Sequence, residues 1–129
     1  MAHHYTAAVT LLALLLYLAL IVNAGRARGK YGVKAPAVTG NEHFERAYRI
    51  QMNTLEQMPF FLPAMWLYAL TLNDIGAAVG GLIWVVARVL YAVAYTRDPA
   101  TRGPGSAISM LAQVGLFLGA AYGVARAMM

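Results

Sequence analysis

Four polar residues stand at helical spacing just before an apolar segment of the chain: Glu45, Arg49, Asn53 and Glu56, here called the polar stripe. Intervals of four, four and three residues place all of them on one face of a helix. They combine a cation, carboxylates, and an amide that donates and accepts, a set that suits a zwitterionic ligand bearing carboxylates and an amine. They could instead form an internal ladder of ion pairs, with Glu45 bound to Arg49. The residues alone leave both interpretations open.

A second group of polar residues lies in the C-terminal half of the chain. Arg88, Tyr91 and Tyr95 follow one another at intervals of three and four, so they also share a helical face. An arginine inside a membrane span needs a partner, and Glu56 is the candidate nearest in depth, so we expect a structural ion pair between Arg88 and Glu56. Tyr91 and Tyr95 alone are typical of an interfacial aromatic belt, and Arg102 in the next loop is typical of a solvated charge.

The composition excludes several classes of protein. Of the 129 residues, 60% are hydrophobic and only 12% are charged, whereas a soluble domain carries about a quarter charged residues. The chain has no cysteine, so disulfides, thiolate metal sites and a cysteine nucleophile are excluded, and thiol chemistry needs a thiol from the substrate. The net charge of +5 comes from basic residues in short loops, which favours membrane orientation and a small anionic ligand over nucleic acid. The three histidines lack the spacing of metal ligands, so we predict no metal site.

The elements that must position these side chains are transmembrane helices. One all-α domain is expected over residues 1–129. Its four spans are predicted at 5–25, 48–72, 75–96 and 107–125. A cleaved signal peptide is the alternative for the first span, but residues 1–4 lack the lysine or arginine that such signals carry. The S/T-x-x-E form of residues 39–42 is typical of a capping box and predicts that the second helix begins near Thr39.

Basic residues gather at one end of the expected bundle. The first and third loops and the adjoining helix starts hold Arg26, Arg28, Lys30, Lys34, Arg46, Arg49, Arg97 and Arg102. By the positive-inside bias this end faces the cytoplasm, and both termini face the opposite side. The polar stripe, the two tyrosines and Arg102 therefore converge at the cytoplasmic end. Short loops and the lack of a retention tail favour a bacterial inner membrane.

Two motifs resemble the signature of the membrane-associated proteins in eicosanoid and glutathione metabolism (MAPEG). The first is Glu45-Arg46-x-x-Arg49-x-Gln51-x-Asn53-x-x-Glu56-x-x-Pro59. The second is Ala87-Arg88-x-x-Tyr91-x-x-x-Tyr95, with Arg102 seven residues later. The resemblance covers nearly the whole chain, and two separate motifs at the expected distance make it specific. It favours the ligand-binding interpretation of the polar stripe.

The resemblance implies a homotrimer of four-helix bundles that binds glutathione between subunits near the cytoplasmic face. By position, the glutathione-binding residues would be Arg28, Arg49, Gln51, Asn53, Glu56, Tyr91 and Tyr95. Arg102 would be the catalytic residue, since it matches the arginine proposed to stabilise the glutathione thiolate. Gln57 departs from the aromatic residue of several mammalian members, and Arg26 could replace Arg28 after a small shift in register.

The implied activity is that of a membrane-bound glutathione S-transferase, with glutathione as substrate or cofactor. The thiolate would attack hydrophobic electrophiles, as in detoxification, or reduce lipid hydroperoxides in a peroxidase reaction. A glutathione-dependent isomerase would use the same site and return the cofactor unchanged. A non-catalytic lipid-binding scaffold of the same family is the other alternative, which the full set of polar residues disfavours.

Overall fold

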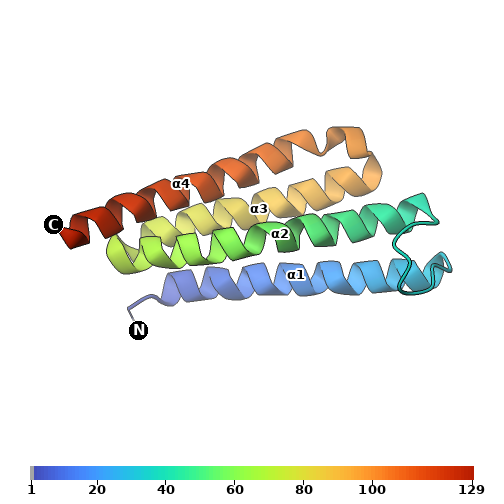
Figure 1. Cartoon of the computed structure of the whole chain (residues 1–129), viewed down its shortest axis with the longest axis horizontal. Helices are drawn as coiled ribbons and strands as arrows, with labels where there is room; N and C mark the ends of the chain where they lie inside the picture. Colours follow the sequence, from blue (N-terminus) through green and yellow to red (C-terminus); the bar gives the residue numbers. More distant parts are fainter. Residues whose placement is uncertain (1) are drawn as a thin grey trace.

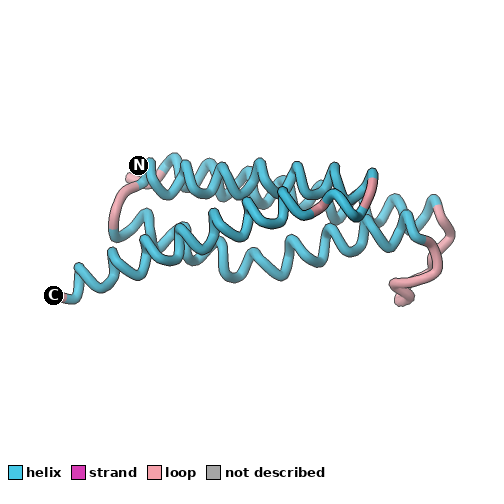
Figure 2. The backbone as a smooth tube through the Cα atoms, turned by 90° about the horizontal axis from the view of Figure 1, so that it is seen from above, coloured by secondary structure: helices cyan, strands magenta, loops and turns pink. Residues whose placement is uncertain are grey.

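The chain is a bundle of long helices. A computed structural model describes residues 2–129, which form no strand. Its elements are α1 (His4–Lys30), α2 (Glu42–Thr71), α3 (Asp74–Arg97), the short 3-10 helix η1 (Pro99–Thr101) and α4 (Gly103–Met128). Both termini lie at one end of the bundle, and the α1–α2 and α3–α4 connections lie at the other (Figure 1). The helices run alongside one another over most of their length (Figure 2), so the predicted all-α class is confirmed.

The core lies between α2, α3 and α4, where large side chains are fully buried. The rings of Phe61 on α2 and Trp84 on α3 stack with centroids 3.9 Å apart. The indole N–H of Trp84 donates to Oε1 of Gln113 on α4 at 3.1 Å, so both buried polar groups are satisfied. From α1, Val9 and Ala13 complete the same cluster. This packing fixes the rotation of α2 and α3, the two helices that carry the polar groups.

Large apolar side chains also cover much of the outside of the bundle. Leu11 on α1 is 68% exposed and Leu111 on α4 is 72% exposed, as expected of a surface that faces lipid or another apolar surface. By length and hydropathy, three helical segments within residues 2–129 could span a membrane: His4–Lys30, Asp74–Arg97 and Pro99–Met128. The polar stripe lowers the hydropathy of α2, which is not among them, so the four-span count stays a prediction.

The N-cap of α2 lies two residues later than predicted. Asn41 is the N-cap, and its Oδ1 accepts hydrogen bonds from the backbone N–H groups of His43 and Phe44 at 2.9 and 3.1 Å. Gly40 has a φ of 125°, a conformation that glycine adopts readily and that cannot belong to a right-handed helix. The capping-box pattern was therefore assigned to the wrong residue, because an asparagine two positions further on caps the helix.

Candidate functional site

Arg88 is the centre of a buried polar network that joins three helices. Its side chain is fully buried on α3. Nη2 donates to Oδ1 of Asn53 at 2.7 Å and to Oγ1 of Thr54 at 2.9 Å, both on α2. Nη1 donates to Oγ of Ser109 on α4 at 3.3 Å, and the guanidinium carbon lies 4.0 Å from the centre of the Tyr91 ring. Arg88 therefore holds Asn53 and Tyr91 in fixed positions relative to each other.

The expected ion pair between Arg88 and Glu56 does not form. No acidic side chain within residues 2–129 lies within 4.0 Å of the Arg88 guanidinium. Glu56 follows Thr54 by two residues, which turns its side chain by about 200° around the helix, away from α3. Its side chain is 59% exposed and lies 3.9 Å from that of Arg49. Neutral oxygens and an aromatic ring hold the Arg88 charge instead of a carboxylate.

The polar stripe on α2 is open to the outside of the bundle. The Arg49 and Glu56 side chains are 54% and 59% exposed. Glu45 does not pair with Arg49, since its Oε2 accepts from the backbone N–H of Gly40 at 3.2 Å. The oxygen of Asn53 is occupied by Arg88, so its amide N–H groups are the part left to meet a ligand. A cation, a carboxylate and an amide donor are thus presented side by side. Of the alternative ladder, the expected Glu45–Arg49 pair does not form, while Arg49 and Glu56 pair with each other at 3.9 Å.

The tyrosines of α3 connect this network to Arg102. The rings of Tyr91 and Tyr95 lie with centroids 5.6 Å apart. The guanidinium carbon of Arg102 lies 5.6 Å from the Tyr95 ring centre, and Nη1 donates to the carbonyl oxygen of Pro99 at 2.8 Å. A continuous line of contacts, here called the site line, therefore runs from Asn53 through Arg88 and both tyrosines to Arg102.

Four residues of the predicted set lie outside the site line: Arg49 and Glu56, which pair with each other on the polar stripe, and Arg28 and Gln51, which lie apart from both. Nη1 of Arg28 donates to the carbonyl oxygen of Ala37 at 2.7 Å, and its guanidinium packs over the Phe44 ring at 4.6 Å. Gln51 is half-buried on α2, and no hydrogen bond within residues 2–129 joins it to the site line. One chain thus brings Asn53, Tyr91, Tyr95 and Arg102 into one line, but not Arg28 or Gln51.

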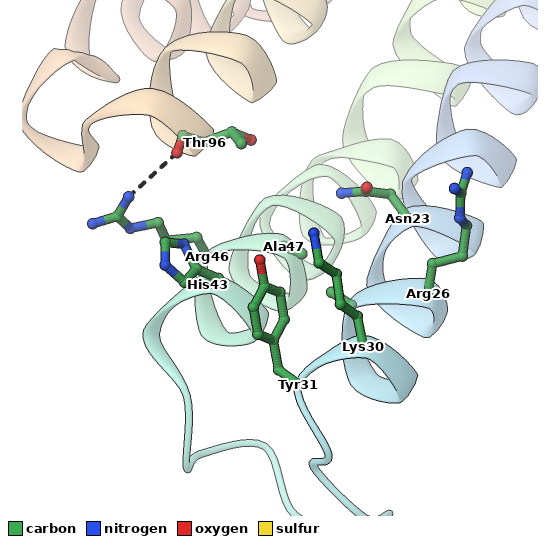
Figure 3. Close-up of a pocket in the computed structure, with 9 residues that line it drawn as sticks. Asn23, Arg26, Lys30, Tyr31, His43, Arg46, Ala47 and Thr96 are labelled. Atoms are coloured by element: carbon green, nitrogen blue, oxygen red, sulfur yellow. Dashed lines mark hydrogen bonds between the residues drawn. The ribbon is translucent and has the colours of Figure 1, made fainter.

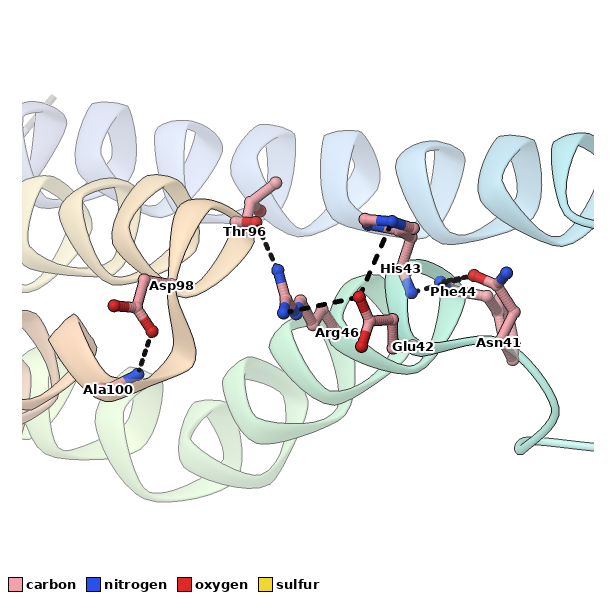
Figure 4. A network of polar contacts seen from close by, with 8 residues as sticks. All are labelled: Asn41, Glu42, His43, Phe44, Arg46, Thr96, Asp98 and Ala100. Carbon is pink, nitrogen blue, oxygen red and sulfur yellow. Dashed lines mark hydrogen bonds and ion pairs between the residues drawn. The ribbon is translucent and has the colours of Figure 1, made fainter.

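The sequence interpretation missed a cavity at the basic end of the bundle. It has a volume of about 400 Å³ (Figure 3). Its lining comprises Asn23, Arg26, Ala27, Lys30, Tyr31, His43, Arg46, Ala47 and Thr96. In Figure 4, Arg46 reaches from α2 to the backbone oxygen of Thr96 on α3, which closes one side. The four-residue interval between Arg26 and Lys30 was a signal that both cations face the same way.

The sequence interpretation also missed the partners of Arg88. Thr54 and Ser109 were not singled out, because a single hydroxyl in an apolar helix carries no pattern of its own. The signal was Arg88 itself, since a buried guanidinium has five N–H donors to satisfy. Without a carboxylate in reach, nearby hydroxyl and amide oxygens are the remaining acceptors.

Comparison with known proteins gives one family and several relatives. The model of the MAPEG family matches residues 6–122. An uncharacterized protein of Synechocystis is 48% identical over 116 residues, which cover 90% of this chain and 85% of that protein. Microsomal glutathione S-transferase 2 of Homo sapiens is 38% identical over 73% of this chain and 63% of its own length. Leukotriene C4 synthase of Cavia porcellus is 36% identical over 74% of this chain and 64% of its own length. The match thus spans less than two thirds of either enzyme.

Proposed function

Because this chain belongs to the MAPEG family, we propose that it is a membrane-bound glutathione S-transferase. Its substrates would be glutathione and a hydrophobic electrophile, with lipid hydroperoxides as a second class. The observation that carries the proposal is the site line, which joins the polar stripe on α2 to the tyrosines of α3 and to Arg102. Relatives named as glutathione transferases support the same chemistry.

The polar stripe matches the two charged ends of a small peptide. Glutathione carries two carboxylates, an amine, two amide bonds and a thiol. In the proposed complex Glu56 pairs with the amine and Arg49 with a carboxylate, each from a side chain that is more than half exposed. The amide N–H groups of Asn53 donate to a further oxygen of the peptide. Tyr91 and Tyr95 then lie along the path from the stripe toward Arg102.

Arg102 is proposed to supply the positive charge that favours the thiolate. A free thiol with a pKa of about 8.5 is only a few per cent ionised at pH 7. An opposite charge within hydrogen-bonding distance lowers such a pKa by roughly 1–3 units. The thiol then releases its proton to solvent, the thiolate sulfur forms a bond to the electrophilic carbon, and the leaving group departs with its electron pair. The exposed position of Arg102 at the start of α4 allows it to approach a ligand at the bundle end.

A homotrimer with glutathione between subunits accounts for the residues that lie apart. Arg28 and Gln51 are outside the site line of their own chain, and the polar stripe is open at the surface. A neighbouring copy that packs against α2 would bring its own Arg28 and Gln51 to the stripe. We accordingly propose that each site takes residues from two subunits.

The proposed setting is a four-span protein of a bacterial inner membrane. The basic end would face the cytoplasm and both termini the opposite side. The three apolar segments and the Synechocystis relative support a bacterial membrane protein. α2 would complete the four spans, with its polar stripe turned to the ligand and a neighbouring subunit rather than to lipid.

Three substrates separate the possible reactions at this site. Purified protein in detergent would be given glutathione with an aromatic halide, a lipid hydroperoxide or a lipid endoperoxide. A transferase forms the thioether from the halide, a peroxidase oxidises glutathione, and an isomerase converts the endoperoxide with glutathione unchanged. Thioether formation that depends on the protein is the expected result. No turnover of any of the three, with glutathione bound, would indicate a scaffold and contradict the proposal.

A further inference from the structure

A second polar site lies where α1, α2 and α3 meet at the basic end of the bundle (Figure 3). α1 contributes Asn23, Arg26 and Lys30 to this basic cavity, and Tyr31 follows directly. α2 contributes His43 and Arg46. Apart from Arg26, which was the alternative to Arg28, none of its lining residues belongs to the predicted glutathione set, so it is a separate site within one chain.

Of the three cations that line the basic cavity, Arg46 pairs with Glu42 and the other two have no carboxylate partner within residues 2–129. Three cationic side chains line the cavity, those of Arg26, Lys30 and Arg46, and no carboxylate does. Arg26 and Lys30 form no ion pair within residues 2–129. The carboxylate nearest to Arg46 is that of Glu42, at 4.0 Å, and its side chain is 72% exposed. A recess lined by one sign of charge, with apolar walls behind it, concentrates counter-ions of the opposite sign.

Contacts within the lining hold its polar groups in place. Nη1 of Arg46 donates to the carbonyl oxygen of Thr96 at 3.3 Å, which ties α2 to α3 (Figure 4). The rings of Tyr31 and His43 stack with centroids 5.2 Å apart, which ties the end of α1 to α2. Nζ of Lys30 lies 5.4 Å from the centre of the Tyr31 ring. The site is therefore partly organised before any ligand arrives, which lowers the entropy cost of binding.

We propose that the basic cavity binds a phosphate-bearing anion, either the headgroup of an anionic phospholipid or a soluble phosphate ester. A phosphate offers more acceptor oxygens and more charge than one carboxylate, and so matches three cations. Arg26 can bind two of its oxygens with parallel N–H groups, while Lys30 acts as a point charge. A volume of about 400 Å³ has room for the phosphate and its ester substituent. Basic recesses between membrane helices at the cytoplasmic side suit the headgroups of anionic lipids, and the basic end of this bundle is the end proposed to face the cytoplasm.

The test compares two lysines at the same end of the bundle. Both lysines are exposed, but Lys30→Glu reverses a charge that lines the cavity, whereas Lys34→Glu makes the same change in the following loop, outside the lining. Lys30→Arg keeps the charge. Each variant of the detergent-purified full-length protein is titrated with dioleoylphosphatidylglycerol, and with dioleoylphosphatidylcholine as the zwitterionic control, by native mass spectrometry. Glycerol 3-phosphate is titrated separately, with binding followed by phosphorus NMR line width.

Saturable binding of phosphatidylglycerol in preference to phosphatidylcholine, weakened about tenfold or more by Lys30→Glu alone, is the result expected for a lipid headgroup. The same pattern with glycerol 3-phosphate would support the proposal with a soluble ester as the ligand. Lys30→Arg should bind like the unmodified protein in either case. If Lys30→Glu and Lys34→Glu weaken binding of the probe equally, the probe is attracted by the overall surface charge and the proposal is overturned. A lack of saturable binding of both probes would overturn it as well.

Discussion

At the scale of single residues, Arg88 links stability to ligand binding. A buried guanidinium without a carboxylate depends on every hydrogen bond that it makes, because an unsatisfied charged donor in an apolar interior is costly. Thr54 accepts from both Nε and Nη2, at 3.3 and 2.9 Å, which makes it the most heavily used partner. Asn53 accepts a further bond through Oδ1, which leaves its amide N–H groups outside the Arg88 network.

Thr54→Val should therefore destabilise the protein by about 1–3 kcal/mol, because it removes a buried acceptor and leaves the Arg88 charge in place. Thr96→Val is the matched control. Its hydroxyl donates only to the carbonyl of its own helix, and the residue is exposed. Equilibrium unfolding in mixed detergent micelles measures both variants. Equal stability of the two would contradict the role assigned to Thr54.

Arg102→Ala should raise the pKa of the bound glutathione thiol toward its free value, because the nearby positive charge is lost. Less thiolate would then be present at pH 7, and conjugation should slow roughly tenfold or more, with recovery as the pH rises through the new pKa. Glutathione affinity should change little. Arg97→Ala, another exposed arginine at the same bundle end, is the control. An unchanged pH–rate profile in Arg102→Ala would remove Arg102 from the mechanism.

At the scale of elements, the close approach of α4 to α3 positions the start of α4. A Cβ on Gly105 would lie 2.7 Å from the backbone N of Tyr91 and 2.9 Å from the carbonyl oxygen of Ala87. Backbone atoms cannot move aside as a flexible side chain can, so this first turn of α4 packs directly on α3. Arg102 stands one turn before Gly105, and the contact therefore sets its distance from Tyr95.

Gly105→Ala should push the two helices apart and destabilise the protein by about 1–3 kcal/mol. Gly115→Ala on the same helix is the matched control, since a Cβ there meets nothing within 4 Å. Thermal unfolding in detergent and the glutathione thiol pKa would be measured for both. We expect Gly105→Ala to lower the melting temperature and to raise the thiol pKa. Equal behaviour of the two glycine variants would show that this contact does not position Arg102.

The helices were predictable from the sequence, but the contacts between them were not. Apolar length predicts a helix, and intervals of three and four residues show which side chains share a face. The relative rotation of two helices depends on packing such as Phe61 on Trp84, which no local pattern reveals. For that reason the polar stripe was found, whereas Arg88 was assigned the wrong partner and the basic cavity was missed.

At the scale of the whole molecule, the proposed function makes the glutathione site depend on assembly. The polar stripe is open at the surface of one chain, and Arg28 contacts Ala37 and Phe44 rather than the site line. If each glutathione site takes Arg28 from one subunit and Arg49 from its neighbour, two different inactive variants can complement each other.

Arg28→Ala and Arg49→Ala should each be inactive alone, while mixed assemblies of the two should recover activity. In a mixed ring of three copies, about one site in three would combine an intact Arg28 with an intact Arg49. Co-expression with two different affinity tags isolates the mixed particles, and their mass should correspond to three copies. No recovery in the mixed particles would place both arginines in the same subunit's site. Activity of either single variant alone would show that its arginine has no role.

The most direct test of the central claim is to titrate the thiolate absorbance of glutathione bound to the detergent-purified protein as the pH is varied. The proposed transferase predicts saturable binding and a thiol pKa roughly one to three units below that of free glutathione, so that thiolate predominates near neutral pH. Saturable binding with an unshifted thiol pKa would contradict thiolate activation, and a non-catalytic scaffold would be the remaining interpretation. No binding at millimolar glutathione would mean that the polar stripe does not bind glutathione, and the proposed function would fall with it.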